Sequence, residues 1–212
     1  AESEIAAINM VYGAASTGKK VLTSSSSPGI SLKLEGISYL AGAELPAVIV
    51  NVVRGGPGLG TIQPSQADYF QSVKGGGHGD YKLYVLAPAS VQEMSDFVED
   101  AFDIAFKYRA PVLILSDGLI GQMMEKVNLK DQQPRLTDEE LIEKHGDWAV
   151  TGRKDRERNI ITSLDLESEK MEARVRRLMK KYEQMEKEDL RYEKINCDDA
   201  EYLIVAYGSS AR

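Results

Sequence analysis

The sequence predicts an α/β fold, a mainly parallel sheet with helices on both faces, followed by a charged helical extension. Strand-like apolar segments begin near residues 20, 47, 83 and 111, and helical patterns separate them. Strands that alternate with helices in this way form βαβ units, whose strands pair in parallel. The second observation is a change of composition after about residue 126, where polar and then strongly charged segments follow.

The first four elements follow from apolar spacing. Residues 2–17 carry apolar side chains at helical intervals, and Gly18 is a typical helix stop. A short strand is predicted at 21–23, and a helical pattern returns over 30–43. Residues 47–53 are apolar and β-branched almost throughout, as expected of a strand that is buried on both faces.

The next elements complete the predicted sheet. Residues 65–73 are compatible with a short helix, whereas the glycines of 75–80 exclude regular structure there. A strand is predicted at 83–87. A helix over 90–108 begins with the capping-box pattern of a serine followed three residues later by a glutamate, and 111–116 is another apolar strand.

These patterns divide the chain into three parts: an α/β core over 1–126, a polar and helical extension over 127–197, and the start of a following α/β domain over 198–212. The extension contains a charged helix over 167–194 with one apolar stripe, which favours packing on the flank of the core and leaves a subunit contact as the alternative. Tyr202–Tyr207 resembles the opening strand of the next unit. We therefore expect the chain to be a fragment.

Composition excludes several classes of protein. The chain has 26 Lys and Arg against 33 Asp and Glu, a net charge of −7, which argues against a nucleic-acid binder. Its single cysteine excludes an intrachain disulfide and a cysteine-ligated iron–sulfur cluster within this chain. Two histidines without a nearby carboxylate pair predict no metal site. No apolar run is long enough for a transmembrane helix and no secretory signal is present, so the cytoplasm is the expected compartment.

Two glycine motifs imitate nucleotide-binding loops. Gly13–Lys20 has the spacing of a phosphate-binding P-loop, but Lys20 stands where a Ser or Thr should bind magnesium, and the motif follows a helix instead of a strand. Gly55–Gly60 follows a strand but lacks the Gly-x-Gly-x-x-Gly spacing of the dinucleotide-binding fingerprint. Glycines also serve turns that need a positive φ, which is the simpler interpretation of both motifs.

Four side chains are candidates for chemistry. Arg54 ends an apolar strand beside glycines, where a guanidinium could bind a carboxylate or phosphate, or form a structural ion pair. His78 lies between glycines and could face an active site or only solvent. Glu2 and Glu4 open the first helix; they complement its dipole, or one of them points into a buried interface as a functional acid.

Four ordered motifs closely resemble the alpha subunit of the 2-oxoacid:ferredoxin oxidoreductases. They are Glu2–Asn9, Thr23–Leu32, Val50–Pro57 and Gly77–Tyr81. The versions Ser-Ser-Ser-Ser-Pro-Gly and Arg-Gly-Gly-Pro-Gly-Leu-Gly are most similar to the branched-chain, 2-oxoisovalerate type. The resemblance covers residues 2–125 well, and the charged segment after 130 is much less diagnostic.

The resemblance implies the pyrimidine-binding domain of the thiamine-diphosphate-binding fold. It implies that Glu4, more than Glu2, hydrogen-bonds N1′ of the cofactor's aminopyrimidine as the catalytic acid, and that Ser27, Pro28 and Gly29 line the cofactor. It also implies that Arg54 binds the substrate carboxylate. We place His78, in the family's His-Gly-Asp motif, with the substrate-binding residues, although the resemblance gives it no defined role.

The resemblance further implies the partners and cosubstrates. Thiamine diphosphate is shared with a beta subunit that binds its diphosphate and Mg²⁺. Iron–sulfur clusters belong to gamma and ferredoxin-like subunits that pass electrons to ferredoxin, and coenzyme A accepts the acyl group. Two alternatives stay open from the sequence: a non-catalytic α/β binding or scaffold subunit, and a ferredoxin-independent thiamine-diphosphate decarboxylase.

Overall fold

A computed structural model of the chain, which describes residues 1–153 and 156–212, contains one parallel four-stranded sheet. The strands are β1 (Leu22–Ser25), β2 (Ala47–Val53), β3 (Tyr84–Leu86) and β4 (Pro111–Asp117), in the spatial order β1-β2-β4-β3. β2 pairs with β4 along its whole length, from Ala47 opposite Pro111 to Val53 opposite Asp117. The predicted α/β class and all four predicted strands are confirmed.

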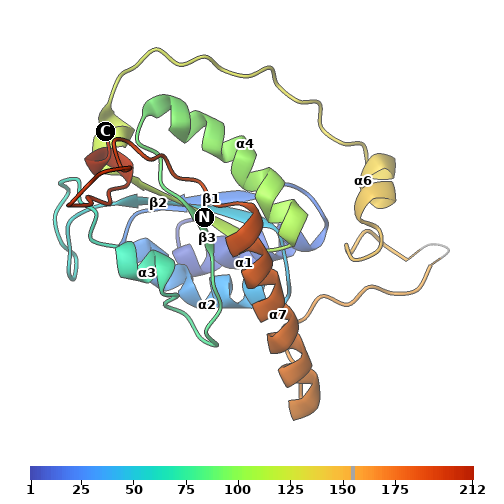
Figure 1. The fold of residues 1–212 in the computed structure, drawn as a ribbon. Coiled ribbons are helices and arrows are strands. Elements are labelled where there is room, and N and C mark those ends of the chain that lie inside the picture. Colours follow the sequence, from blue (N-terminus) through green and yellow to red (C-terminus); the bar gives the residue numbers. More distant parts are fainter. Residues whose placement is uncertain (154–155) are drawn as a thin grey trace.

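Helices cover both faces of this sheet, as predicted (Figure 1). Helices α1 (Glu4–Ser16) and α2 (Pro28–Gly42) share one apolar cluster with Ile49 and Leu113, whereas α4 (Val91–Tyr108) packs in a second cluster with Val48, Val112 and Ile114. Alternate residues of the two central strands thus point to opposite faces, and both faces are buried. The short helices α3 (Tyr69–Val73) and α5 (Gly118–Gln122) follow β2 and β4 respectively.

The charged extension packs on the flank of the core through α7 (Ser168–Glu188). The predicted stripe is buried at Leu178, Tyr182 and Met185, which join the cluster of α4. Met171 and Val175, nearer the start of the helix, are more than one-third exposed. The apolar stripe therefore contacts the core over its C-terminal half.

Helix α6 (Asp138–His145) was not predicted, because the surrounding segment is polar. Its signal in the sequence is local: Thr137 accepts a hydrogen bond from the backbone NH of Glu140, and the Glu140 carboxylate accepts one from the backbone NH of Thr137. The end of α6 packs beside Gly18, whose added Cβ would lie 3.2 Å from Ala149 Cβ. Gly18, with φ +78°, ends α1 and leaves room for this contact.

The prediction of a strand at Tyr202–Tyr207 is wrong for this structure. Residues 202–206 are exposed and belong to no strand, and only the following turn, η1 (Gly208–Ser210), packs on β4. A single strand cannot satisfy its backbone groups without a neighbour, and no described residue offers one to this segment. That residues 198–212 open a further domain stays a prediction.

Candidate cofactor site

The candidate site lies at the carboxyl edge of the sheet, where the loops after β1 and β2 meet. β1 ends at Ser25, and a loop of two residues connects it to Pro28, the first residue of α2. β2 ends at Val53 and is followed by Arg54. Because both strands run in the same direction, their following loops lie at one edge, the usual ligand side of a parallel sheet.

Glu4 reaches this edge from the first turn of α1. A Cβ added to Gly29 would lie 2.9 Å from Glu4 Oε1 and 2.0 Å from Ser25 Oγ, so both side chains lie close against this glycine. α1 and α2 pack along each other, which fixes where the carboxylate lies. The Glu4 carboxyl group and the Ser25 hydroxyl thus meet at the backbone of Gly29. This is where the resemblance places the cofactor's pyrimidine.

Ser27 is held in a conformation that few residues adopt. Its φ is +24°, and its side chain is almost fully buried. Its backbone NH donates to Asn51 Oδ1 at 3.1 Å, and its hydroxyl accepts from the backbone NH of Arg54 at 3.1 Å. These two bonds tie the loop after β1 to β2, and they compensate for the strained backbone.

Asn51 extends this connection to the next loop. It is fully buried, and its amide group donates to Asp68 Oδ2 at 3.0 Å. Asp68 precedes α3, so one buried amide connects three segments of the candidate site: the loop after β1, β2 itself and the start of α3. The side chain's donor and acceptor are both used, as a buried polar group requires.

Arg54 begins the glycine-rich loop and is half-buried. Its Nη2 donates to the carbonyl of Leu59 at 3.1 Å, and the loop closes through a hydrogen bond from Thr61 NH to the carbonyl of Gly55 at 2.8 Å. At Gly60, with φ +69°, an added Cβ would lie 1.9 Å from the Gly55 carbonyl oxygen. The glycines therefore serve the tight turn, which supports the structural interpretation of this motif over a dinucleotide fingerprint.

His78 lies apart from these residues. It is exposed in a loop whose glycines pack on the middle of α2, where an added Cβ on Gly77 would lie 2.8 Å from the carbonyl oxygen of Leu34. Hydrogen bonds connect Ser27 to Arg54, and Gly29 contacts Glu4, but in the described parts of the chain no such contact brings His78 to this group. Glu2 is likewise exposed.

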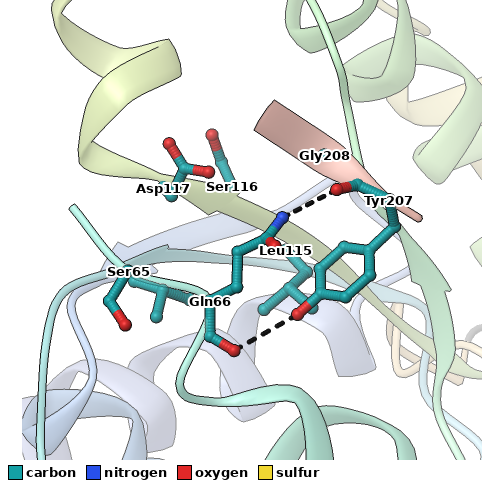
Figure 2. A pocket seen from close by; sticks show the side chains of 8 residues that line it. Ser65, Gln66, Leu115, Ser116, Asp117, Tyr207 and Gly208 are labelled. Carbon is teal, nitrogen blue, oxygen red and sulfur yellow. Dashed lines mark hydrogen bonds between the residues drawn. The ribbon is translucent and has the colours of Figure 1, made fainter. Parts of the chain in front are cut away.

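A small pocket adjoins the site at the carboxyl ends of β2 and β4 (Figure 2). Gln66 closes it by donating from Nε2 to the carbonyl of Tyr207 at 2.7 Å, and Tyr207 donates its hydroxyl back to the Gln66 carbonyl at 3.3 Å. The Asp117 carboxylate at its wall accepts from the backbone NH groups of Leu119 and Ile120 and from the Ser209 hydroxyl. These groups satisfy one another, so the pocket is a structural junction between the sheet edge and residues 207–210.

Lys33 and Asn51 also belong to this edge, although the sequence did not predict a role for either. The Lys33 side chain is 1% exposed, and its ammonium donates to Thr23 Oγ1 at 2.7 Å and to the carbonyl of Ser24 at 3.0 Å. A polar residue inside an apolar pattern was the available signal in both cases, since Lys33 lies on the buried face of α2 and Asn51 interrupts the apolar run of β2.

Within residues 1–153 and 156–212, no group of three or more His, Cys, Asp or Glu side chains is arranged to hold a metal ion. No helix in those same ranges has the length and apolar character needed to cross a membrane.

Comparison with known proteins defines the class to which this fold and site belong. Residues 1–194 match the family model described as pyruvate flavodoxin/ferredoxin oxidoreductase, thiamine diP-bdg. The chain belongs to this family of thiamine-diphosphate-binding domains of 2-oxoacid oxidoreductases.

Individual relatives agree with the family model. The chain is 54% identical over 214 residues to the ketoisovalerate oxidoreductase subunit VorB of Methanothermobacter thermautotrophicus, covering 100% of this chain and 58% of that protein. It is 39% identical over 216 residues to the 2-oxoglutarate synthase subunit KorA of Archaeoglobus fulgidus, covering 100% of this chain and 60% of that protein. The chain thus spans about three-fifths of the length of these relatives.

A solved structure shares the fold. It is the 2-oxoglutarate:ferredoxin oxidoreductase from Magnetococcus marinus with 2-oxoglutarate, coenzyme A and succinyl-CoA bound. The TM-score is 0.70 with 27% sequence identity, over 90% of this chain and 37% of that one.

Proposed function

We propose that the chain contributes the pyrimidine-binding half of the active site in a thiamine-diphosphate-dependent 2-oxoacid:ferredoxin oxidoreductase. One observation carries the proposal: in a chain of this family, the Glu4 carboxylate and the Ser25 hydroxyl both lie against Gly29 at the carboxyl edge of the sheet. The reaction would convert a 2-oxoacid anion and coenzyme A into an acyl-CoA and carbon dioxide, with two electrons passed to ferredoxin and one proton released.

The residues at this edge fit the aminopyrimidine of the cofactor. Gly29 presents backbone without a side chain, and any Cβ there would clash with Ser25 Oγ and crowd Glu4. The absence of a side chain at position 29 thus lets the Glu4 carboxyl group and the Ser25 hydroxyl approach this edge, and N1′ of a bound pyrimidine would need a carboxyl group within reach. Ser27 and Pro28 then serve mainly as backbone that lines the cofactor, because the Ser27 hydroxyl is already used within the protein.

Glu4 is the group that exchanges a hydrogen bond with N1′, so it holds the proton whose position controls the cofactor's reactivity. When bound, thiamine diphosphate supplies the electron sink that decarboxylation of a 2-oxoacid requires. Asn51 and Ser27 keep the loops at this edge in fixed positions. Positioning by rigid neighbours is what makes such a proton transfer efficient.

Arg54 is proposed as the anchor of the substrate carboxylate. Its guanidinium lies at the end of β2, and its bond to the Leu59 carbonyl uses one of five N–H donors, which leaves donors for an anion. A guanidinium binds a carboxylate through two parallel hydrogen bonds. His78 stays a weaker candidate for substrate binding, since it is exposed on the loop beside the middle of α2.

For the substrate we propose a branched-chain 2-oxoacid such as 2-oxoisovalerate. The support is the higher identity to two proteins named as ketoisovalerate oxidoreductase subunits, 54%, than to two matched over the whole chain and named as 2-oxoglutarate synthase subunits, 39% and 38%. Partner subunits would bind the diphosphate with Mg²⁺ and carry the iron–sulfur clusters, because this chain has a single cysteine.

The test is purification of the intact complex, followed by a panel of 2-oxoacids assayed for ferredoxin or viologen reduction. The proposal expects reduction that depends on thiamine diphosphate and coenzyme A, with the highest kcat/KM for a branched-chain 2-oxoacid. Decarboxylation without any electron transfer would favour the ferredoxin-independent decarboxylase instead. No stabilisation of the complex by thiamine diphosphate would favour the scaffold alternative.

A further inference from the structure

Lys33 carries a positive charge inside the protein at a position where burial is costly. Its side chain is 1% exposed, and its two hydrogen-bond partners, Thr23 Oγ1 and the Ser24 carbonyl, are neutral. Replacing a buried ion by an apolar side chain of similar size is often neutral or stabilising. A lysine here therefore needs a reason other than stability.

Lys33 lies one helical turn after Gly29, the residue that contacts the candidate acid. Gly29 and Lys33 are four residues apart on α2, so they share one face of the helix, one turn apart. Gly29 lies against the carboxylate of Glu4 and the hydroxyl of Ser25, and Lys33 bonds to the two preceding residues of β1 that carry oxygen acceptors. The ammonium is thus anchored on β1, one helical turn beneath the contact between Gly29 and Glu4.

The negative charge of Glu4 acts on the Lys33 ammonium. Burial lowers the pKa of the Lys33 ammonium, and the Glu4 carboxylate opposes that lowering from α1. Because Lys33 is buried and Glu4 is half-buried, water screens this interaction less than it would between two exposed groups.

We propose that Lys33 is a positioning residue for the cofactor acid: it supplies the buried positive charge that keeps the Glu4 carboxylate turned inward against Gly29. This inference rests on the proposed function of Glu4 and names a second residue on which that function depends. Without the charge, the half-buried carboxylate would turn toward water, and its hydrogen bond to the pyrimidine would be lost or altered.

The test uses the intact complex with Lys33→Met, which removes the charge, and Lys19→Met as the control. Lys19 is an exposed lysine, so its replacement makes the same change in net charge away from the site. Thiamine diphosphate is titrated while the near-ultraviolet circular dichroism of the bound cofactor is recorded. We expect about a tenfold higher Kd in K33M, an altered dichroism band, and wild-type behaviour in K19M. An unchanged Kd and spectrum in K33M would overturn the proposal.

Two further variants separate charge from hydrogen bonding. Thr23→Val removes one partner of the ammonium but keeps the charge, so the Kd should stay within threefold of wild type. Lys33→Gln keeps a donor without the charge and should behave like K33M, which preserves the test if K33M does not assemble. If T23V reproduced the whole loss seen in K33M, the hydrogen bond and not the charge would be responsible, and the proposal would fail.

A double-mutant cycle tests whether Lys33 acts through Glu4. In the Glu4→Gln background, K33M should change the Kd less than twofold, because no carboxylate is left to position. An equal loss in both backgrounds would overturn the proposal. If E4Q alone kept wild-type turnover, the proposed function itself would fail; if E4Q lost turnover while K33M stayed normal, only this inference would fail.

Discussion

Gly29 has no side chain, and the side chains of Ser25 and Glu4 occupy the space where a Cβ would lie. An added Cβ would lie 2.0 Å from Ser25 Oγ and 2.9 Å from Glu4 Oε1, which is closer than real contacts allow. The glycine has an ordinary helical backbone at the start of α2, so its role is the close approach of neighbours and not a special φ.

Gly29→Ala should therefore impair cofactor binding more than stability. The new methyl group displaces Ser25 Oγ and the Glu4 carboxylate, and we expect the Kd for thiamine diphosphate to rise about tenfold, which is about 1.4 kcal/mol. Titration of the intact complex measures this Kd. Gly13→Ala is the matched control, because an added Cβ at Gly13 meets nothing within 4 Å. Equal Kd values in the two variants would contradict the role given to Gly29.

Arg54 allows a second test at the residue scale. Arg54→Met should raise the KM for the 2-oxoacid and lower kcat/KM by about 10²-fold, because charge-assisted hydrogen bonds to a carboxylate are lost. Steady-state kinetics of the complex gives both constants. Arg54→Lys keeps the charge but cannot form two parallel hydrogen bonds, so its kcat/KM should lie between those of wild type and R54M. An unchanged kcat/KM in R54M would show that Arg54 does not bind the substrate and that its role is the hydrogen bond to Leu59 within the loop.

Helix α7 is held to the core by charge as well as by its apolar stripe. Glu44, in the turn before β2, accepts from Arg177 at 2.7 Å and from Lys181 at 2.7 Å, and Lys181 also donates to the Arg109 carbonyl. Burial alone would raise the pKa of the Glu44 carboxyl, but hydrogen bonds and charges from Lys181 and Arg177 outweigh it and lower this pKa from 4.5. The contacts thus favour the charged form in the folded state.

Glu44→Gln should lower the free energy of local opening of α7 by about 1–2 kcal/mol, which is the scale of charge-assisted hydrogen bonds in a partly exposed cluster. Hydrogen exchange of peptides from 168–188 in the intact complex measures the change. Because the folded-state pKa lies below the unfolded one, the stabilisation is present above about pH 4.5 and disappears as the pH falls through the folded pKa. The difference between E44Q and wild type should therefore shrink in acid.

The exposed pair of Glu172 and Arg176 on the same helix provides the control. Glu172→Gln should change the opening free energy of α7 by less than about 0.5 kcal/mol, since exposed ion pairs one helical turn apart contribute little to stability. Equal protection of α7 in wild type and E44Q at neutral pH would show that the apolar contacts alone hold the helix.

Across the whole molecule, the sequence predicts whatever depends on local apolar periodicity. The four strands and the helices α1, α2, α4 and α7 have such patterns, and the structure contains all of them. Segments 138–145 and 202–206 differ from prediction for one reason: in each, tertiary contacts or their absence decide the outcome. In the first segment, a polar capping box starts helix α6, and residues 141–149 pack against Gly18. In the second segment, apolar residues form no strand, because the part of the chain that the structure describes offers no neighbouring strand to pair with them.

The candidate site is predictable to a similar extent. The motifs name Glu4, Gly29 and Ser27, and the structure brings these residues to one sheet edge with Arg54. Lys33 and Asn51 were not predicted, because a single polar residue in an apolar pattern does not reveal which segments it connects. Their partners lie 10 and 9 residues away for Lys33, and 24 and 17 residues away for Asn51, so only the folded chain defines them.

The central claim is that Glu4 is the acid of a thiamine-diphosphate site, and turnover of Glu4→Gln in the intact complex tests it most directly. Glu2→Gln is the matched control, since Glu2 is an exposed carboxylate two residues earlier. We expect E4Q to lower kcat by about 10²–10⁴-fold, the contribution typical of general acid–base catalysis, whereas E2Q stays near wild type. Essentially intact turnover in E4Q would contradict the account.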